Sequence, residues 1–220
     1  VLVSRTIDDR DRIGDFIAHY TFEAGSGTTL VDRSGNGNDG TLQDTPTWIT
    51  GSDTALEFDG SNDYVRVNNL DAGVEVDEFT IAVAYKPDTG AQKQELVEHI
   101  SGVDNWGLEL KSDSTNTYDP VYFAGENGGS QSDQISAGVR NIRQKRVLVG
   151  TYDGSSIDVF VDGNHQDSGS FSSEISMDDM YIGRDAERSD DYFDGKISEI
   201  RLYYSAFDEN EVASISKAMS

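Results

Sequence analysis

The sequence predicts an all-β fold in which two antiparallel sheets pack as a sandwich, with one short helix at the C-terminal end. Short apolar runs with period-two alternation, starting at Phe16, are separated by Gly, Asp and Asn turns almost to the end of the chain. Asp153-Gly154 and Asp162-Gly163 lie between such runs, which is the strongest local signal for a β-hairpin. No helices alternate with the strands, as parallel βαβ units would require. Because neither a linker nor a repeat of about 20–50 residues divides the chain, we expect one domain at 16–220 behind an N-terminal arm at 1–15.

Length and charge limit the function classes. With 220 residues the chain is long enough for one large β domain or two small ones. Its net charge of −24 repels phosphate backbones and anionic lipids, so we expect neither nucleic acid nor a membrane surface as a partner. Asp outnumbers Glu, and only 6 residues are Lys. This composition favours adaptation to high salt, where the Debye length falls to about 3 Å at 1 M. An ordinary acidic secreted protein that binds divalent ions is the alternative.

Composition also excludes several kinds of site. The chain has no Cys, so a disulfide, a thiol nucleophile and a Cys-based metal site are all absent. Its 3 His residues lack the HExxH spacing of a zinc enzyme. No apolar run approaches the ~18 residues of a membrane span. The chain starts at Val1 rather than Met, so we expect a processed or trimmed chain.

The N-terminal arm and the first strand differ sharply in character. Val1–Val3 is apolar and is followed by the charged run Asp8–Arg12, which could pair with a sheet edge or be a stub that docks into a partner. The first clear strand is 16–22, with Tyr20 and Phe22 on one face.

A glycine-rich bend follows at Asp32–Gly40. Gly and Asn tolerate positive φ, so the backbone can fold tightly here and direct several oxygens toward one point. Oxygen-only ligation suits a hard cation such as calcium. The residues alone leave both a polar turn and a metal site open.

The remaining elements follow from alternation and turn chemistry. Pro87 ends one apolar strand, since proline cannot donate to a ladder. Asp208–Glu211 resembles a capping box in front of Val212, Ile215 and Met219, which predicts the C-terminal helix. Strands are predicted at 56–58, 64–67, 79–85, 106–110, 121–124, 147–152, 157–161, 180–182 and 197–204.

Five ordered segments carry a family resemblance: Tyr20–Leu42, Ala55–Val65, Phe79–Pro87, Val159–Gly163 and Phe193–Tyr203. Together they resemble the landmarks of the laminin-G-like, concanavalin A-like lectin domains over about residues 16–215, with Tyr85 where Trp is common in the family. The resemblance implies a two-sheet antiparallel jelly roll. It says less about function, because this fold hosts lectins, adhesion modules, glycosidase-attached modules and enzymes.

The resemblance also implies a structural calcium. Many relatives hold one ion between the opening loop and the closing strand, which points to Asp32, Asn36 and Asn38 with Asp194 opposite them. Calcium takes about 6–8 oxygen ligands, and backbone carbonyls would supply the rest. This expectation requires the bend to meet the Phe193–Gly195 corner.

Catalytic chemistry is not expected. Some relatives of this fold are glycosidases that use a strand of alternating carboxylates, and the nearest stretch here, Ser156–Phe160, offers only Asp158. Glycoside hydrolysis needs two carboxyl groups. No His lies at a recognisable spacing from a nucleophile, and no Gly-x-Ser-x-Gly elbow occurs.

Ligand binding is the remaining interpretation of the function. Jelly-roll modules hold sugars on rim loops or on the concave sheet, where aromatic rings stack on the sugar and polar groups bond its hydroxyls. The candidate loops are 86–94, 112–120, 125–134 and 184–191, which suit glycan hydroxyls but also any soluble loop at high salt. The candidate ligand-binding residues at or near them are Tyr118, Tyr122, Arg184 and Tyr192, whereas Trp106 alternates with Leu108 and Leu110 and is expected in the core.

We therefore expect a non-catalytic extracellular adhesion or binding module that recognises surface glycans or another cell-surface polymer in a saline medium. The alternative is a structural subunit of a virion, pilus-like filament or surface layer. In that case residues 1–12 would mediate self-assembly by docking into a neighbouring copy.

Overall fold

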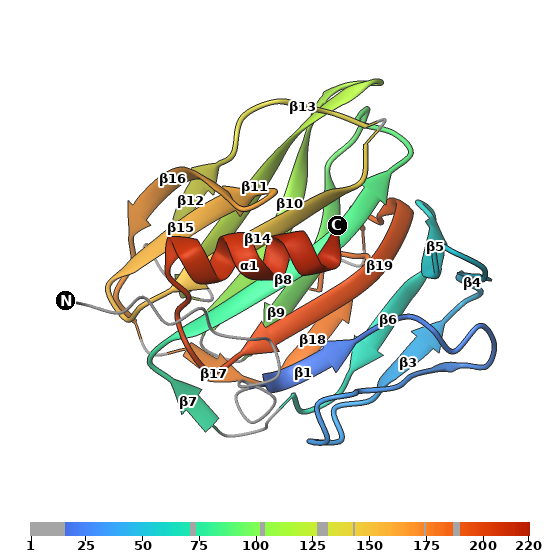
Figure 1. Ribbon diagram of the computed structural model, residues 1–220, viewed down its shortest axis with the longest axis horizontal. Helices are drawn as coiled ribbons and strands as arrows, with labels where there is room; N and C mark the ends of the chain where they lie inside the picture. The colour runs from blue at the N-terminus through green and yellow to red at the C-terminus, as the bar shows by residue number, and fades with distance from the viewer. Residues whose placement is uncertain are drawn as a thin grey trace.

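Figure 1 shows the computed structural model, which describes residues 16–70, 74–101, 104–126, 132–142, 144–173, 175–186 and 190–220. The predicted arm at 1–15 lies outside the described residues. The described strands all pair antiparallel, in two large sheets and a small one, and the one helix in this part of the chain is C-terminal. The predicted all-β jelly-roll sandwich is confirmed.

The two large sheets are built from strands far apart in the sequence. The eight-stranded sheet has the order β16 (Asn164–Ser170), β15 (Ser156–Val161), β14 (Arg146–Tyr152), β8 (Phe79–Pro87), β19 (Asp194–Tyr203), β5 (Ala55–Asp59) and β4 (Thr47–Ile49), with β1 (Phe16–Tyr20) also paired to β19. The nine-stranded sheet has the order β12 (Ser132–Ser136), β11 (Thr117–Glu126), β10 (Asp104–Ser114), β9 (Gln94–Ile100), β18 (Asp179–Ile182), β6 (Tyr64–Val67), β3 (Gly40–Gln43) and β2 (Thr29–Leu30), with β13 (Arg140–Asn141) paired to β11. The small sheet pairs β17 (Ile175–Met177) with β7 (Val74–Val76).

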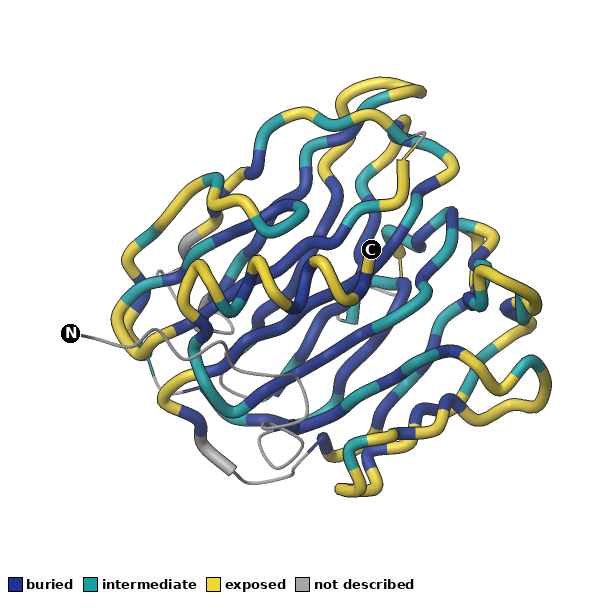
Figure 2. Tube along the Cα trace, viewed as in Figure 1, coloured by how far each residue is buried: buried dark blue, intermediate teal, exposed yellow. Residues whose placement is uncertain are grey.

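The main core lies between the two large sheets. Trp106, Leu108 and Leu110 alternate inward from β10 and are fully buried, as predicted. The sheets approach closely at Gly150 of β14, where a Cβ atom would lie 2.9 Å from the ring of Tyr122 on β11. Figure 2 shows the buried strands at the centre of the molecule and the exposed residues on its loops and on one side of the helix.

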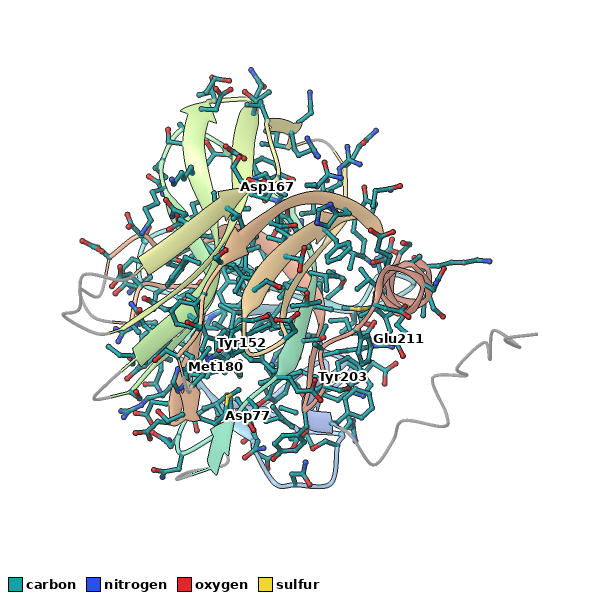
Figure 3. The ribbon with its side chains drawn as sticks, turned by 90° about the vertical axis from the view of Figure 1, so that its left-hand side faces the viewer. Asp77, Tyr152, Asp167, Met180, Tyr203 and Glu211 are labelled. Atoms are coloured by element: carbon teal, nitrogen blue, oxygen red, sulfur yellow. The ribbon has the colours of Figure 1, made fainter. Side chains whose placement is uncertain are left out.

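Helix α1 (Glu209–Met219) covers the outer face of the eight-stranded sheet (Figures 1 and 3). Its residues Val212, Ile215 and Met219 pack into a second apolar cluster with Ala82 and Ala84 of β8. Both faces of β8 are therefore buried, which explains why its outward positions are small and apolar. The predicted capping box is confirmed, because the Asp208 carboxylate accepts from Asn210 and Glu211 while Glu211 accepts from the Asp208 N–H.

No helix in the described residues is long and apolar enough to cross a membrane.

Candidate binding site on the nine-stranded sheet

The outer face of the nine-stranded sheet carries a continuous row of polar and aromatic residues. The one helix in the described part of the chain packs on the other sheet and does not cover this face, but the middle of the face is buried at Tyr181, Glu98 and Gly107. Residues directly opposite each other on neighbouring strands point to the same face. The row, read across the strands from β3 to β12, is Thr41, Arg66, Tyr181, Glu98, Gly107, Phe123 and Gln134.

At one end of the row, an arginine lies over two neighbouring tyrosine rings. The guanidinium carbon of Arg184 is 4.2 Å from the ring centre of Tyr64 and 4.6 Å from that of Tyr181. Arg66 lies 5.6 Å from the Tyr181 ring centre and pairs with Asp179 at 2.5 Å. These cation–π contacts hold the planar groups in place and leave a surface with both stacking and hydrogen-bonding capacity.

In the middle of the row, a glycine leaves room for an aromatic ring to pack over the sheet beside a buried acid. A Cβ atom on Gly107 would lie 2.8 Å from ring atoms of Phe123, so the ring lies over this position. On the other side, Glu98 of β9 is buried and accepts a hydrogen bond from the N–H of Ala186. This contact ties the connection after β18 to the sheet.

Beside the row lies a group of carboxylates around one lysine. Lys93 Nζ lies 2.7 Å from Glu95 Oε1, 3.1 Å from Glu109 Oε2 and 3.1 Å from Asp191 Oδ2. Burial, followed by repulsion from Glu109, raises the pKa of Glu95 well above its usual value. Burial alone would lower the pKa of Lys93, but Glu95 and Glu109 raise it instead.

A bulge brings these acids onto one face. Glu95 and Glu98 are three residues apart, an odd spacing that would normally place them on opposite faces of a strand. The β9–β10 register shifts between Leu108 and Glu109, so Val97 pairs with Leu108 but Glu95 pairs with Glu109. The extra residue, Leu96, restores the shared face.

The predicted ligand-binding residues separate into two groups. Tyr118 and Tyr122 are fully buried, and their rings belong to the core between the sheets. Their predicted stacking on a surface ligand is therefore wrong for this structure, since their strand β11 turns these positions inward. Arg184 lies on the outer face, and the partly exposed Tyr192 is on the same β18–β19 connection.

The predicted calcium ligands do not come together. Asp32 Oδ1 accepts from the His19 N–H at 3.0 Å, and His19 pairs with Arg201 of β19. Asp194 begins β19 seven residues earlier, which places it roughly 20 Å along the strand at ~3.3 Å per residue. It lies instead beside Gly60, where a Cβ atom would approach the Asp194 Cβ to 2.7 Å. The bend and the Phe193–Gly195 corner therefore do not meet.

Within the bend, side chains satisfy the backbone. Asp32 Oδ2 accepts from Ser34 Oγ at 2.6 Å and from the Asn38 N–H at 3.0 Å. The Asn36 and Asn38 side chains donate to the carbonyls of Phe16 and Ile17. Although burial alone would raise the pKa of Asp32, the hydrogen bonds from Ser34, His19 and Asn38 hold it below its usual value. The hydrogen bonds of Asp32, Asn36 and Asn38 thus hold the bend against β1.

Asp158 meets a histidine and a serine that the sequence spacing did not reveal as neighbours. His165 Nε2 lies 2.8 Å from Asp158 Oδ1 and 2.9 Å from Ser168 Oγ. A Ser-His-Asp triad uses both ring nitrogens, one toward the acid and one toward the serine. Here one nitrogen faces both partners, so the group lacks the geometry of a proton relay.

A cavity of about 670 Å³ lies on the opposite sheet, beside the C-terminal end of α1. Lys86, Lys145 and Lys196 line it. Lys196 pairs with Glu57 at 2.9 Å, and Lys145 donates to the Met219 carbonyl at 2.8 Å. Two of the three lysines are therefore engaged within the protein, and the outer row of the nine-stranded sheet is the better candidate site.

Comparison with known proteins supports the fold. A family model described as the concanavalin A-like lectin/glucanases superfamily, Laminin_G_3, matches residues 59–213. No curated protein matches the chain.

Several solved structures share the architecture at low sequence identity. Domain 4 of the extracellular arabinanase AbnA from Geobacillus stearothermophilus, solved with arabinotriose, has a TM-score of 0.70 and 17% identity over 92% of this chain and 98% of that domain. The binding domain of paraclostridial mosquitocidal protein 1 has a TM-score of 0.74 and 15% identity over 94% of this chain and 52% of that domain. The binding domain of botulinum neurotoxin DC, solved with rat synaptotagmin II, has a TM-score of 0.73 and 10% identity, and the chain spans about half of its length.

Proposed function

Because the chain belongs to the concanavalin A-like lectin/glucanase superfamily, we propose that it is a non-catalytic binding module that recognises a glycan or another cell-surface polymer. The site is the outer row of the nine-stranded sheet. The observation that carries the proposal is the Tyr64–Arg184–Tyr181 stack on the outer sheet face, in which Tyr64 and Arg184 are partly exposed.

The chemistry of this row suits sugars. Aromatic rings offer flat apolar faces to the C–H face of a pyranose or furanose ring, while a guanidinium, a carboxylate and an amide bond its hydroxyls. Arg184 and the exposed Gln134 provide the guanidinium and the amide along one face, whereas the Glu98 carboxylate is buried and accepts from the Ala186 N–H. Structural similarity adds support, since the arabinanase domain of the same architecture was solved with an oligosaccharide.

Charge narrows the ligand class. A protein of net charge −24 repels anionic polymers, so a neutral polysaccharide is favoured over an acidic one. The same charge supports an extracellular or cell-surface location in a saline medium, where screening reduces the self-repulsion of the folded chain. A melting temperature that rises between low and molar salt is expected; a temperature that is independent of salt would contradict the saline location.

The decisive experiment is a glycan-array screen in molar salt, with and without calcium, followed by calorimetric titration of the best neutral oligosaccharide. Arg184→Ala and Tyr64→Ala are expected to weaken binding by about 10-fold or more, since each removes one member of the stack. Lys217→Ala, on the exposed side of α1, is the control and keeps wild-type affinity. Failure of the wild-type protein to bind any glycan, or equal binding by all variants, would reject the site.

Two further proposals concern assembly and calcium. The alternative role as a structural subunit depends on residues 1–12, which lie outside the described residues. A structural calcium also remains a proposal, but its ligands are not the four residues predicted from the sequence, because these do not converge.

A further inference from the structure

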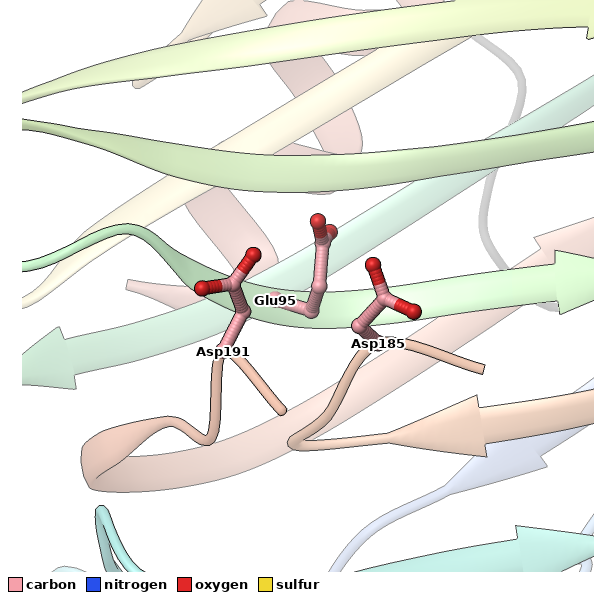
Figure 4. A group of neighbouring side chains, drawn as sticks. All are labelled: Glu95, Asp185 and Asp191. Atoms are coloured by element: carbon pink, nitrogen blue, oxygen red, sulfur yellow. The ribbon is translucent and has the colours of Figure 1, made fainter. Parts of the chain in front are cut away.

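Three carboxylates from different segments converge beside the outer row. The ligand atoms of Glu95, Asp185 and Asp191 all lie within 4.8 Å of one another. Glu95 comes from β9, and the two aspartates come from the two ends of the β18–β19 connection. Figure 4 shows the carboxylate of Glu95 between those of Asp191 and Asp185.

Backbone hydrogen bonds hold the two segments together. The N–H of Glu95 donates to the Asp191 carbonyl at 2.9 Å, and the N–H of Asp185 donates to the Asp190 carbonyl at 3.0 Å. The N–H of Gly183 donates to the Leu96 carbonyl at 3.0 Å. The main chain therefore fixes the positions from which the three carboxylates project.

One oxygen of this group is buried and has no partner. Glu95 is only 1% exposed, and its Oε2 atom accepts no hydrogen bond. Lys93 contacts the other oxygen, Oε1, at 2.7 Å. A buried carboxylate oxygen without a donor is costly, because it has lost its water and gained nothing in return.

Lys93 faces several carboxylates at once. Its ammonium group serves Glu95, Glu109 and Asp191 together, and Asp185 adds a further carboxylate that is 6% exposed. Glu109 also lies directly opposite Glu95 in the ladder, where like charges are unfavourable. A second cation at the unpartnered oxygen would resolve both the desolvation and the repulsion.

We propose that Glu95 Oε2, Asp185 and Asp191 bind a hard divalent cation, with calcium as the best fit. Carboxylate oxygens without nitrogen or sulfur suit calcium or magnesium rather than zinc. Calcium accepts the irregular oxygen sets that two loop ends and a strand present, with water completing its shell of about 6–8 ligands. This site is separate from the bend at Asp32–Gly40, and it does not depend on glycan recognition.

The ion has a structural consequence. It links β9 to the connection that carries Arg184, one residue before the ligand Asp185. Binding therefore fixes the approach of Arg184 to Tyr64 and Tyr181, and adds to the stability of the folded chain by mass action.

The test uses metal ions alone, without sugar. Chelator-treated protein is titrated with CaCl₂ by calorimetry, and its melting temperature is recorded with and without calcium. Wild-type protein is expected to bind with a Kd on the order of 10⁻⁴ M and to melt at a higher temperature with calcium. Glu95→Gln and Asp185→Asn each weaken calcium binding by about 10-fold or more.

The controls locate the site. Asp190→Asn changes an exposed aspartate of the same connection and keeps wild-type affinity, and so does Asp32→Asn in the bend. If Glu95→Gln fails to fold, Asp185→Asn alone decides. No calcium binding by wild-type protein up to about 10 mM would overturn the proposal. Unchanged affinity in Asp185→Asn would overturn it as well.

Discussion

The Asp32 carboxylate accepts a hydrogen bond from the main-chain N–H of His19 at 3.0 Å, across 13 residues of chain. Its second oxygen accepts from Ser34 Oγ and from the Asn38 N–H. The glycine-rich bend thus folds around a carboxylate whose oxygens already have donors. The same composition that suits a cation-binding loop also suits a bend held by hydrogen bonds to a carboxylate, because both need tight turns around an acidic side chain.

Asp32→Ala is expected to destabilise the protein by about 2–4 kcal/mol, because several buried N–H groups lose their acceptor at once. The pKa of Asp32 is lowered in the folded state. Its contribution is therefore present above the unfolded pKa of about 3.9 and is lost as pH falls through the folded value. Urea unfolding at pH 7 and pH 3 measures both effects. Ser34→Ala removes one of these bonds and costs about 1 kcal/mol. An equal cost for Asp32→Ala and Ser34→Ala would show that the other hydrogen bonds to Asp32 do not stabilise the bend.

Much of the fold could be predicted because its signals are local. The strand predicted at 79–85, the Asp153-Gly154 hairpin and the Asp208 capping box each follow from a few neighbouring residues, and each is present, with the strand extending to Pro87. Strand β9 (Gln94–Ile100) was missed because its bulge hides the period-two pattern among acidic residues. The covering of β8 by α1 was also not foreseen, since sequence alternation does not reveal which element packs on the second face.

Because His99 is buried as a neutral group, we expect the protein to lose stability in mild acid. Burial lowers its pKa to about 3, and its Nε2 accepts from the Asp178 N–H at 2.7 Å, so the folded protein keeps it neutral. The unfolded chain takes up this proton near pH 6.5. The contribution of neutral His99 to the free energy of unfolding is thus fully present above about pH 6.5. It is lost as pH falls toward 3, and about 2 kcal/mol of it is lost between pH 7 and pH 5.

The stability of a His99→Gln variant, followed by urea unfolding across this range, isolates the effect. The wild-type advantage over His99→Gln shrinks as pH falls, whereas it stays constant if His99 does not titrate in this way. His165→Gln, at an exposed histidine, is the control for the substitution itself.

The capping box makes a separate prediction for the C-terminal helix. Asp208 Oδ1 accepts from the N–H groups of Asn210 and Glu211 at 2.9 Å each. Asp208→Ala leaves both without this acceptor and is expected to cost about 1 kcal/mol. Thermal unfolding measures the loss. Asn210→Ala alters an exposed side chain and should stay within about 0.5 kcal/mol of wild type.

The contact between the sheets at Gly150 can be tested by a double-mutant cycle with Tyr122. A Cβ atom there would approach the Tyr122 ring to 2.9 Å, so Gly150→Ala overpacks the core and is expected to cost about 1–3 kcal/mol. In a Tyr122→Leu background the ring is gone, and the same substitution should cost less. A double-mutant cycle by urea unfolding measures this difference. Additive costs would show that Tyr122 does not limit the space at Gly150.

The candidate site was harder to predict than the fold because it depends on register across strands. The sequence predicts Arg184 as a ligand-binding residue from its loop. Its contacts with both Tyr64 and Tyr181 depend on the pairing of β6 with β18, two strands that are far apart in the sequence. Tyr118 and Tyr122 were misassigned because composition places a tyrosine near a loop without fixing its face. The carboxylates around Lys93 share a face only through the bulge in β9.

Arg184→Lys separates charge from shape in the proposed glycan site. Lysine keeps the positive charge but lacks the planar group that lies 4.2 Å and 4.6 Å from the two ring centres. If stacking orders the site, glycan affinity falls by about 10-fold while the melting temperature changes little, because the side chain is partly exposed. Calorimetric titration of the oligosaccharide measures the change. Arg146→Lys, beside Asp162 on the other sheet, is the matched control. Retained affinity in Arg184→Lys would show that the charge of residue 184, rather than its planar geometry, binds the ligand.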